Sequence, residues 1–351
     1  MEGQGIHPMA SEPRPTVRQS HSSDGPRCLV VMYHYVHDVE PIALPRRAGE
    51  DSVTGIPALT TAQFRHQLDQ LCAGLEPMDW PTLYASLRET AALPHRSFLL
   101  TFDDGLADHA EIVAPILQEY GLRGTFFVPG SILLSHRLLS AHALQLLLSI
   151  LEPNLIEKEV CESLRRDGVN PTTLTGAADV TELARQVYHY ESPDRARLKY
   201  LLNMMIPSGL RDITVQYVFE KHIGSATRWA KHWYLGWDDL VELQNHGHTI
   251  GGHGFRHEPL TRLNALEAMT DLTRAKKTLD EGLGVDPRPF SYPFGRHDDP
   301  VASACRKAGF VHGFTTDGRW LTGADDLLRL PRVDVIHVGR VLSEVGLCTS
   351  A

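Results

Sequence analysis

The chain has 351 residues, a length that fits two domains or one large α/β domain with an insertion. Hydrophobic residues make up 42% of it and charged residues 22%, an ordinary globular composition that disfavours collagen-like, disordered and membrane-spanning classes. Its 43 acidic and 34 basic side chains give a formal net charge of -9, which argues against nucleic acid as a partner because phosphate binding needs a basic surface.

The first segment, residues 1–26, is rich in Pro, Ser, Gly and Gln and has no apolar run. A secretory signal needs an apolar stretch of about 7 to 15 residues behind a basic start. We therefore predict a disordered tail here and a cytoplasmic location. No later segment is apolar over enough residues to span a bilayer.

Strands and helices alternate in the predictions for the first part of the chain, which is typical of a βα repeat around a parallel sheet. The strands are apolar runs, and the first helix has a periodic apolar stripe with Thr60 and Thr61 placed to cap it. The expected elements are a strand at 28–36, a helix at 62–75, a strand at 98–102, a helix at 107–120 ended by Gly121, and a strand at 125–128.

The segment 131–235 interrupts this alternation, because it is leucine-rich and shows no strand pattern. We predict a helical insertion that packs on a catalytic domain formed by residues 27–130 and 236–345. The alternation then resumes. The expected elements are a helix at 237–245, a strand at 248–251, a helix at 266–283, a strand at 289–292, a helix at 301–308, and strands at 311–315 and 330–335.

Two adjacent carboxylates, Asp103 and Asp104, follow the apolar strand at 98–102 in the sequence TFDDG. If the strand pleat persists they point in opposite directions, so one can bind an ion while the other faces substrate or water. The alternative for this short sequence alone is a solvated turn that caps a helix.

A histidine pair follows the strand at 248–251, in a chain that holds 19 histidines. His253 and His257 have the i, i+4 spacing that puts both imidazoles on one face of a helical turn. Two imidazoles and one carboxylate form a three-ligand site of the sort that holds Zn²⁺ with an open position. A structural or surface role is the alternative for the pair alone.

A third segment, SYPFG at 291–295, ends an apolar strand in a turn. Taken together and in order, TFDDG, HGFRH and SYPFG resemble the motifs of the polysaccharide deacetylases of carbohydrate esterase family 4. The flanking phrases VMYHYV, GLRGTFFV and LQNHGHTIGGHGFRHEPL are similar to that family too. The resemblance implies an α/β fold, an irregular (β/α) barrel with seven strands, to which the helical insertion is added.

The resemblance also implies the roles of the site residues. Asp104, His253 and His257 would be the ligands of one divalent metal ion, with Zn²⁺ as the default, and Asp103 would be the general base. The backbone N–H of Phe294 would donate to the developing oxyanion. A further expectation is that Tyr292, Phe294 and His34 contact the substrate.

Two positions depart from the family pattern. The arginine that usually opens the third motif and orients the catalytic aspartate is replaced by Ser291, and Arg332 or Arg296 is the candidate to supply the guanidinium. No clean copy of the last motif, which supplies a histidine general acid, is present. His337 is the nearest match in position and His34 is the other candidate, while a core role remains the alternative for either.

The function predicted from the resemblance is metal-dependent hydrolysis of an acetyl group from an N-acetylated or O-acetylated sugar in a glycan or glycan precursor. This makes the protein a hydrolase of a carbon–nitrogen bond other than a peptide bond, with an acetylated saccharide as its partner. Two alternatives stay open. One is an amidohydrolase of a small non-sugar amide or ureide on the same fold, and the other is an inactive relative that binds carbohydrate.

Overall fold

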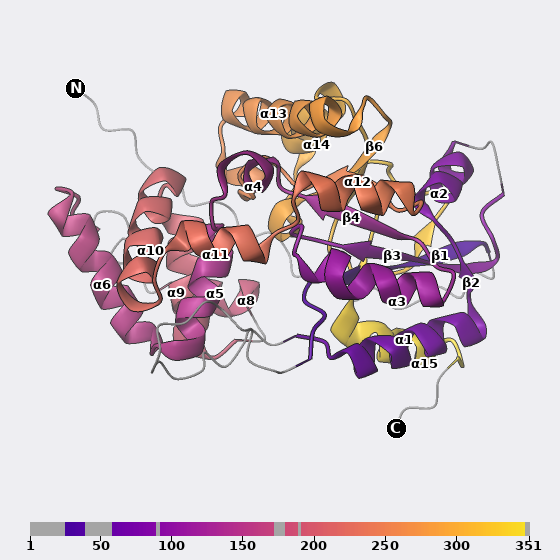
Figure 1. Cartoon of the computed structure of the whole chain (residues 1–351), viewed down its shortest axis with the longest axis horizontal. Helices are drawn as coiled ribbons and strands as arrows, with labels where there is room; N and C mark the ends of the chain where they lie inside the picture. The colour runs from indigo at the N-terminus through magenta and orange to yellow at the C-terminus, as the bar shows by residue number, and fades with distance from the viewer. Residues whose placement is uncertain (1–24, 39–57, 89–91, 172–179, 189–190, 348–351) are drawn as a thin grey trace.

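The computed structural model describes residues 25–38, 58–88, 92–171, 180–188 and 191–347. All but the last two residues of the predicted tail lie outside this part, so its disorder stays a prediction. A sheet surrounded by helices forms one side of the molecule, and a bundle of helices lies beside it (Figure 1).

One curled sheet forms the centre of the first part. Seven of its strands follow one another in the hydrogen-bonded order β7-β6-β5-β4-β3-β1-β8, while β2 pairs with β3 and β9 pairs with β1. Neighbours from β7 to β1 are parallel and β8 is antiparallel to β1. The strands are β1 (Arg27–Tyr33), β2 (Glu76–Pro77), β3 (Arg96–Phe102), β4 (Gly124–Val128), β5 (Thr249–Gly252), β6 (Arg288–Ser291), β7 (Phe310–Phe314), β8 (Leu321–Thr322) and β9 (Val333–Asp334).

The segment 330–334 joins the two sides of this curled sheet. At its start the Leu330 N–H donates to the Gly313 carbonyl, at 2.7 Å, and its carbonyl accepts from the Thr315 N–H, at 2.8 Å. At its end β9 runs parallel to β1, with Val333 beside Val31. The segment therefore lies between β7 and β1 and gives the sheet its barrel-like closure, which places Arg332 at the centre.

The pleat of the strands divides the apolar side chains into two sets. Val30, Leu99 and Phe127 pack inside the curled sheet together with Trp80 and Leu83. The alternate residues pack outward against helices. The helices outside the sheet are α1 (Thr61–Gly74), α3 (Ala114–Glu119) with the π-helical turn η1 (His109–Val113), α12 (Trp237–Asn245), α13 (Ala265–Leu283), α14 (Asp299–Lys307) and α15 (Val338–Glu344). The helix α2 (Trp80–Leu87) instead carries the interior residues Trp80 and Leu83.

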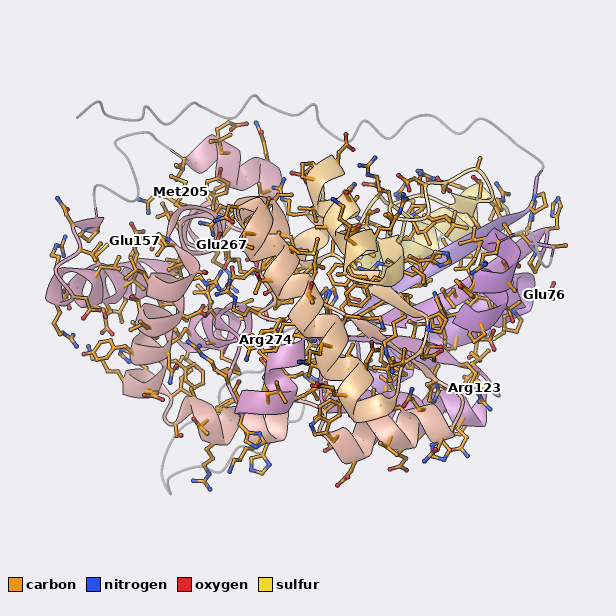
Figure 2. All side chains as sticks on the ribbon, turned by 90° about the horizontal axis from the view of Figure 1, so that it is seen from above. Glu76, Arg123, Glu157, Met205, Glu267 and Arg274 are labelled. Carbon is orange, nitrogen blue, oxygen red and sulfur yellow. The ribbon has the colours of Figure 1, made fainter. Side chains whose placement is uncertain are left out.

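In the part of 131–235 that the structure describes, helices joined by loops form no strand, and one isolated bridge joins Leu106 to Tyr234. Figure 2 shows the same division from above, with Glu157 and Met205 in the helical bundle and Glu76 and Arg123 at the opposite end. Its helices are α4 (Gly130–Ser135), α5 (Ser140–Ile150), α6 (Pro153–Arg166), α8 (Thr181–Val187), α9 (Pro193–Tyr200), η2 (Leu201–Met205), α10 (Ser208–His222) and α11 (Ala226–Trp233). Across the described residues, no helix combines the length and apolarity needed to cross a membrane.

The predicted α/β class and the irregular barrel with seven strands are confirmed, and α12 has the predicted bounds. Thr60 caps α1, as expected, by accepting from the Gln63 N–H. The last predicted strand, 330–335, is largely irregular and keeps only the two residues of β9. The prediction also missed α2, α15 and the strands β2 and β8; the two strands have two residues each, which is too short for a periodicity to be detected.

Candidate active site

The two carboxylates sit where β3 ends. The N–H of Asp103 still donates to the Tyr33 carbonyl, at 3.0 Å, as a strand residue would. Asp104 has a φ of 80° and Gly105 a φ of 63°, so the chain leaves the strand in the left-handed region. The pleat therefore does not persist, and the condition for opposite orientations of the carboxylates is not met. Both approach His253 Nε2, Asp104 Oδ1 at 3.3 Å and Asp103 Oδ2 at 4.0 Å.

The histidine pair lies on the loop after β5, not on a helical turn as the spacing predicts. Gly254 and His257 have φ values of 69° and 56°, which no α-helix accommodates. Asp271 of α13 holds the loop in this shape, because its buried carboxylate accepts from the Phe255 N–H at 2.7 Å and from the Arg256 N–H at 3.1 Å. The loop brings His257 Nε2 to 3.1 Å from Asp104 Oδ1.

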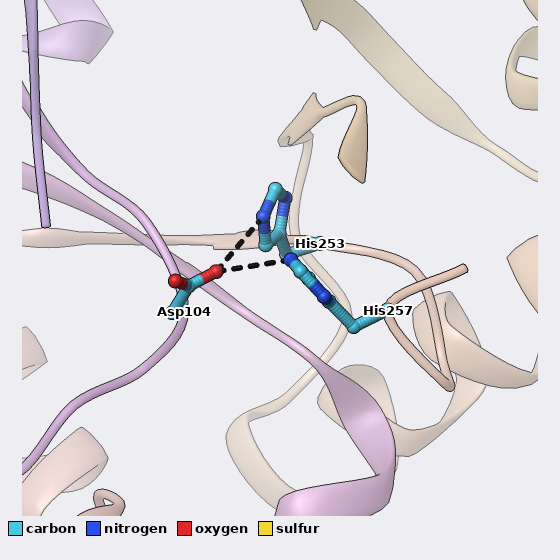
Figure 3. Close-up of side chains that lie close together, drawn as sticks. All are labelled: Asp104, His253 and His257. Carbon is cyan, nitrogen blue, oxygen red and sulfur yellow. Dashed lines mark ion pairs between the residues drawn. The ribbon is translucent and has the colours of Figure 1, made fainter. Parts of the chain in front are cut away.

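Asp104 Oδ1 is a buried oxygen that accepts no hydrogen bond from the described residues. Both histidines point Nε2 at it (Figure 3). His253 Nδ1 lies 2.8 Å from the Ser291 carbonyl, which can only accept, so Nδ1 carries the proton and neutral His253 has its lone pair on Nε2. Three ligand atoms within 4.8 Å of one another therefore fit a divalent cation.

Burial and neighbouring charges shift the pKa values of Asp104, His253 and His257. Burial disfavours the Asp104 carboxylate, but His257 and His142 outweigh that effect and hold its pKa well below the ordinary value. Burial likewise opposes charge on His253, yet Asp103 and Asp104 raise its pKa. Burial dominates at His257, whose pKa falls to about 4. At neutral pH Asp104 is thus anionic and His257 neutral, the states in which both can bind a cation.

Asp103 is held by Arg332 from the closing segment. Arg332 Nη1 donates to Oδ1 and Nη2 to Oδ2, both at 2.7 Å, and Ser291 Oγ donates to Oδ2 at 3.0 Å. Arg332 is 1% exposed, and burial would raise the pKa of Asp103, but Arg332 and then His253 lower it to about 2. Arg332 thus makes the contact with the aspartate that is expected of the missing third-motif arginine. Ser291, the residue that replaces that arginine, adds one more hydrogen bond to Asp103.

The candidates for the general acid lie in different places. His34 directly follows β1, whose last residue, Tyr33, accepts from the Asp103 N–H through its carbonyl. His337 ends the short helix η5 (Val335–His337) and is half-buried, and no hydrogen bond or ion pair in the described part of the chain joins it to Asp103. Its predicted role as general acid has no support from these contacts and stays a prediction.

The third motif contributes two aromatic side chains with different surroundings. Phe294 is half-buried with a φ of 58°, and its ring centre lies 5.0 Å from that of His257, at the edge of the site. Tyr292 is fully buried, and its hydroxyl donates to the Leu328 carbonyl at 2.9 Å. The predicted substrate contact by Tyr292 does not fit this position, because its hydroxyl is used within the core; the side chain packs with Phe290.

One site residue escaped the sequence analysis altogether. His142 of α5 places Nε2 at 3.0 Å from Asp104 Oδ2, and its Nδ1 lies 2.6 Å from the Tyr234 hydroxyl. Both residues belong to the region predicted as an insertion. The sequence shows only that His142 lies in an apolar helical run, and that pattern does not distinguish a histidine buried against a carboxylate from one in an ordinary core.

A curled parallel sheet with an Asp-His-His cluster at the carboxyl ends of its strands defines the class of this protein. The sequence profile of the family described as Polysaccharide deacetylase matches residues 90–170 and 214–313, more than half of the chain. The chain therefore belongs to the polysaccharide deacetylase family. The profile runs into the predicted insertion, up to residue 170 and again from residue 214.

Individual relatives are distant. The putative polysaccharide deacetylase YxkH of Bacillus subtilis is 28% identical over 105 residues, which are 30% of this chain and 37% of that protein. The Streptococcus pyogenes deacetylase PplD has a TM-score of 0.51 at 18% identity, covering 88% of this chain and 93% of that one. A de-N-acetylase from Aggregatibacter actinomycetemcomitans has a TM-score of 0.52 at 15% identity, covering 88% and 94%. These structural likenesses show the fold.

Proposed function

We propose that this protein removes an acetyl group from an acetylated sugar of a glycan or glycan precursor, with one divalent metal ion bound by Asp104, His253 and His257. The observation that carries the proposal is that Asp104 Oδ1, which accepts no hydrogen bond from the described residues, faces two imidazole nitrogens, with the ionised Asp103 beside it. A divalent cation held there supplies Lewis acidity for an acetyl carbonyl. Zn²⁺ suits two imidazoles and a carboxylate, although the donor set also accepts other ions.

The chain's own residues supply the remaining chemistry. Asp103, ionised at neutral pH, takes a proton from the water that attacks the acetyl carbonyl. Arg332 fixes the carboxylate by two parallel hydrogen bonds, and Ser291 adds a third, so the base has one orientation. The Phe294 N–H, held at a left-handed turn beside His257, donates to the developing oxyanion. The products are acetate and, for an N-acetylated sugar, the free amine.

The leaving amine needs a proton, and His34 is our candidate donor. It follows β1, whose end lies next to Asp103, and it is half-buried, so a substrate can reach it. His337 is the alternative from the sequence. A pH–rate profile with a basic limb that is lost in His34→Gln and kept in His337→Gln supports His34, and the reverse pattern supports His337.

The direct test is acetate release from N-acetylglucosamine oligomers, an O-acetylated xylo-oligosaccharide and an N-acetylated amino acid amide, together with the loss of a ureide followed by chromatography. Each is assayed as purified, after chelation, and after Zn²⁺ is added back. We expect release from a saccharide, its loss on chelation, and its recovery with metal. Activity only on the non-sugar amide or the ureide selects the amidohydrolase, and a metal-loaded protein that releases nothing selects the carbohydrate-binding relative.

Metal content gives an independent check on the ligand set. We expect Asp104→Asn, His253→Ala and His257→Ala to lose the bound ion because each removes one of three donors. His248→Gln is the matched histidine control, since His248 Nδ1 accepts from the Gly124 N–H and faces away from the cluster. Unchanged metal content in His253→Ala and His257→Ala contradicts the site.

A further inference from the structure

The carboxylate of Asp104 has two oxygens with different surroundings. Oδ1 faces His253 and His257, while Oδ2 lies 3.0 Å from Nε2 of His142. His142 is 2% exposed and comes from α5, which belongs to the helical bundle and not to the curled sheet. A residue outside the sheet therefore contacts the carboxylate that we assign as a metal ligand.

The hydrogen bonds around His142 have a defined direction. The Leu139 N–H donates to the Tyr234 hydroxyl oxygen at 3.0 Å. Burial raises the pKa of Tyr234 well above its usual value, so Tyr234 keeps its own proton and donates it to His142 Nδ1, at 2.6 Å. Because the ionised Asp104 carboxylate can only accept, His142 Nε2 carries a proton and donates it to Asp104 Oδ2, at 3.0 Å.

This direction distinguishes His142 from the two metal-binding histidines. A nitrogen that donates a proton to a carboxylate has no lone pair for a cation, whereas His253 keeps its Nε2 lone pair because its proton is on Nδ1. The donor atoms that lie within 4.8 Å of one another are likewise those of Asp104, His253 and His257. The contact of His142 is to the ligand and not to the ion.

A second link joins the helical bundle to the other ligand loop. Arg211 of α10 makes two hydrogen bonds to Glu258, at 3.1 and 2.5 Å, and Glu258 directly follows His257. The two side chains are 4% and 1% exposed. The bundle thus holds the Asp104 turn and the His257 loop at the same time.

We propose that His142, oriented by Tyr234, is a positioning residue that holds Asp104 Oδ2 so that Oδ1 alone faces the metal ion. The proposal rests on the metal site of the proposed function. Without the bond to Oδ2 the carboxylate can rotate about its Cβ–Cγ bond, and Oδ1 is no longer fixed between the two imidazoles. The helical bundle is then part of the metal centre. Loss of such a support typically weakens metal affinity about 10–100-fold.

The test measures Co²⁺ binding by the full chain after metal removal, with the Kd and the visible absorption bands as readouts. His142→Leu removes the donor and should raise Kd about 10–100-fold. His142→Gln places an amide N–H near the same point and should restore most of the affinity. The band positions should stay as in the wild-type protein, because the ligands themselves are unchanged.

Two tyrosine variants separate positioning from packing. Tyr234→Phe keeps the ring but loses the hydroxyl that sets the direction of the His142 bonds, and we expect weaker Co²⁺ binding. Tyr188→Phe is the matched control, since Tyr188 is also buried in the bundle and its hydroxyl accepts from Asn203 Nδ2 at 3.1 Å. We expect this variant to bind Co²⁺ as the wild-type protein does. If His142→Leu does not fold, the two tyrosine variants decide.

Several outcomes overturn the inference. One is an unchanged Kd in folded His142→Leu or in Tyr234→Phe, and another is an equal loss in Tyr234→Phe and Tyr188→Phe. A change in the Co²⁺ bands of His142→Leu makes His142 a direct ligand. A wild-type protein that binds no Co²⁺ removes both this inference and the proposed function. Metal binding without acetate release contradicts only the proposed function.

Discussion

The two ends of the curled sheet differ sharply in what they bury. At the carboxyl end the buried groups are charged, and Asp104, His257 and Phe294 adopt left-handed backbone conformations that cost free energy in residues other than glycine. At the amino end α2 closes the interior with Trp80 and Leu83, which pack against Cys28 and Leu99. Apolar packing at the amino end of the barrel therefore stabilises the fold, while the carboxyl end holds charged groups on strained backbone.

The contrast extends to the buried histidines. His253 at the carboxyl end is surrounded by carboxylates that raise its pKa. His312 at the amino end lies against Trp80 and Tyr84, with ring centres 6.0 and 5.3 Å away, and burial lowers its pKa to about 4. The surroundings thus favour the protonated form of His253 at the carboxyl end and the neutral form of His312 at the amino end.

The largest expected effect is at the carboxyl end. Asp103→Asn removes the proposed base, and we expect kcat to fall about 10²–10⁴-fold because the attacking water loses its proton acceptor. Metal content should stay as in the wild-type protein, since Asp103 is outside the ligand set. Steady-state kinetics and elemental analysis of the same preparation check both statements. Loss of the metal together with activity makes Asp103 a ligand instead.

The next effect concerns the guanidinium that supports the base. Arg332→Met leaves the buried Asp103 carboxylate unpaired, and we expect the free energy of unfolding to fall by about 3–5 kcal/mol, measured by urea denaturation at pH 7. Arg296→Met is the control, because Arg296 is half-buried and makes no ion pair with Asp103 among the described contacts. Near-normal activity and stability in Arg332→Met refute its role.

A matched substitution at the amino end should separate stability from activity. Leu83→Ala removes a fully buried side chain from the packing around α2, and we expect a loss of about 2–5 kcal/mol in the free energy of unfolding. At temperatures where the variant is folded, kcat should stay as in the wild-type protein. A large fall in kcat would mean that the two ends are coupled, which would break the comparison.

The smallest effect is a pH dependence that His312 contributes. Its pKa is about 4 in the folded state and 6.5 ordinarily, so on acidification the unfolded state takes up the proton first. The contribution of His312 to the free energy of unfolding is fully present above pH 6.5. It falls as the pH approaches 4, by about 2 kcal/mol between pH 7 and 5. Urea denaturation of His312→Leu at both pH values should show this part of the pH dependence removed. An unchanged difference between pH 7 and 5 contradicts the assignment.

Local patterns were sufficient for much of the fold and for the ligand set. The strand before Asp103 was predictable because it is a continuous apolar run, which a strand buried on both faces requires, and the helix 237–245 because its apolar residues share one face. Asp104, His253 and His257 were predictable because three motifs, taken together and in order, resemble those of one family; each motif alone left a structural alternative open. The short elements β2, β8 and β9 were missed or overextended, since two residues carry no period.

The sequence by itself determined the α/β class and the residues that can bind a metal and move a proton. Only the tertiary structure decided which arginine pairs with Asp103, because the barrel-closing segment brings Arg332 across 229 positions of the chain. It also decided that Tyr292 belongs to the core and that His142 supports Asp104 from the helical bundle. These contacts depend on how segments far apart in the sequence pack together, and a local periodicity or motif does not show which segments will meet.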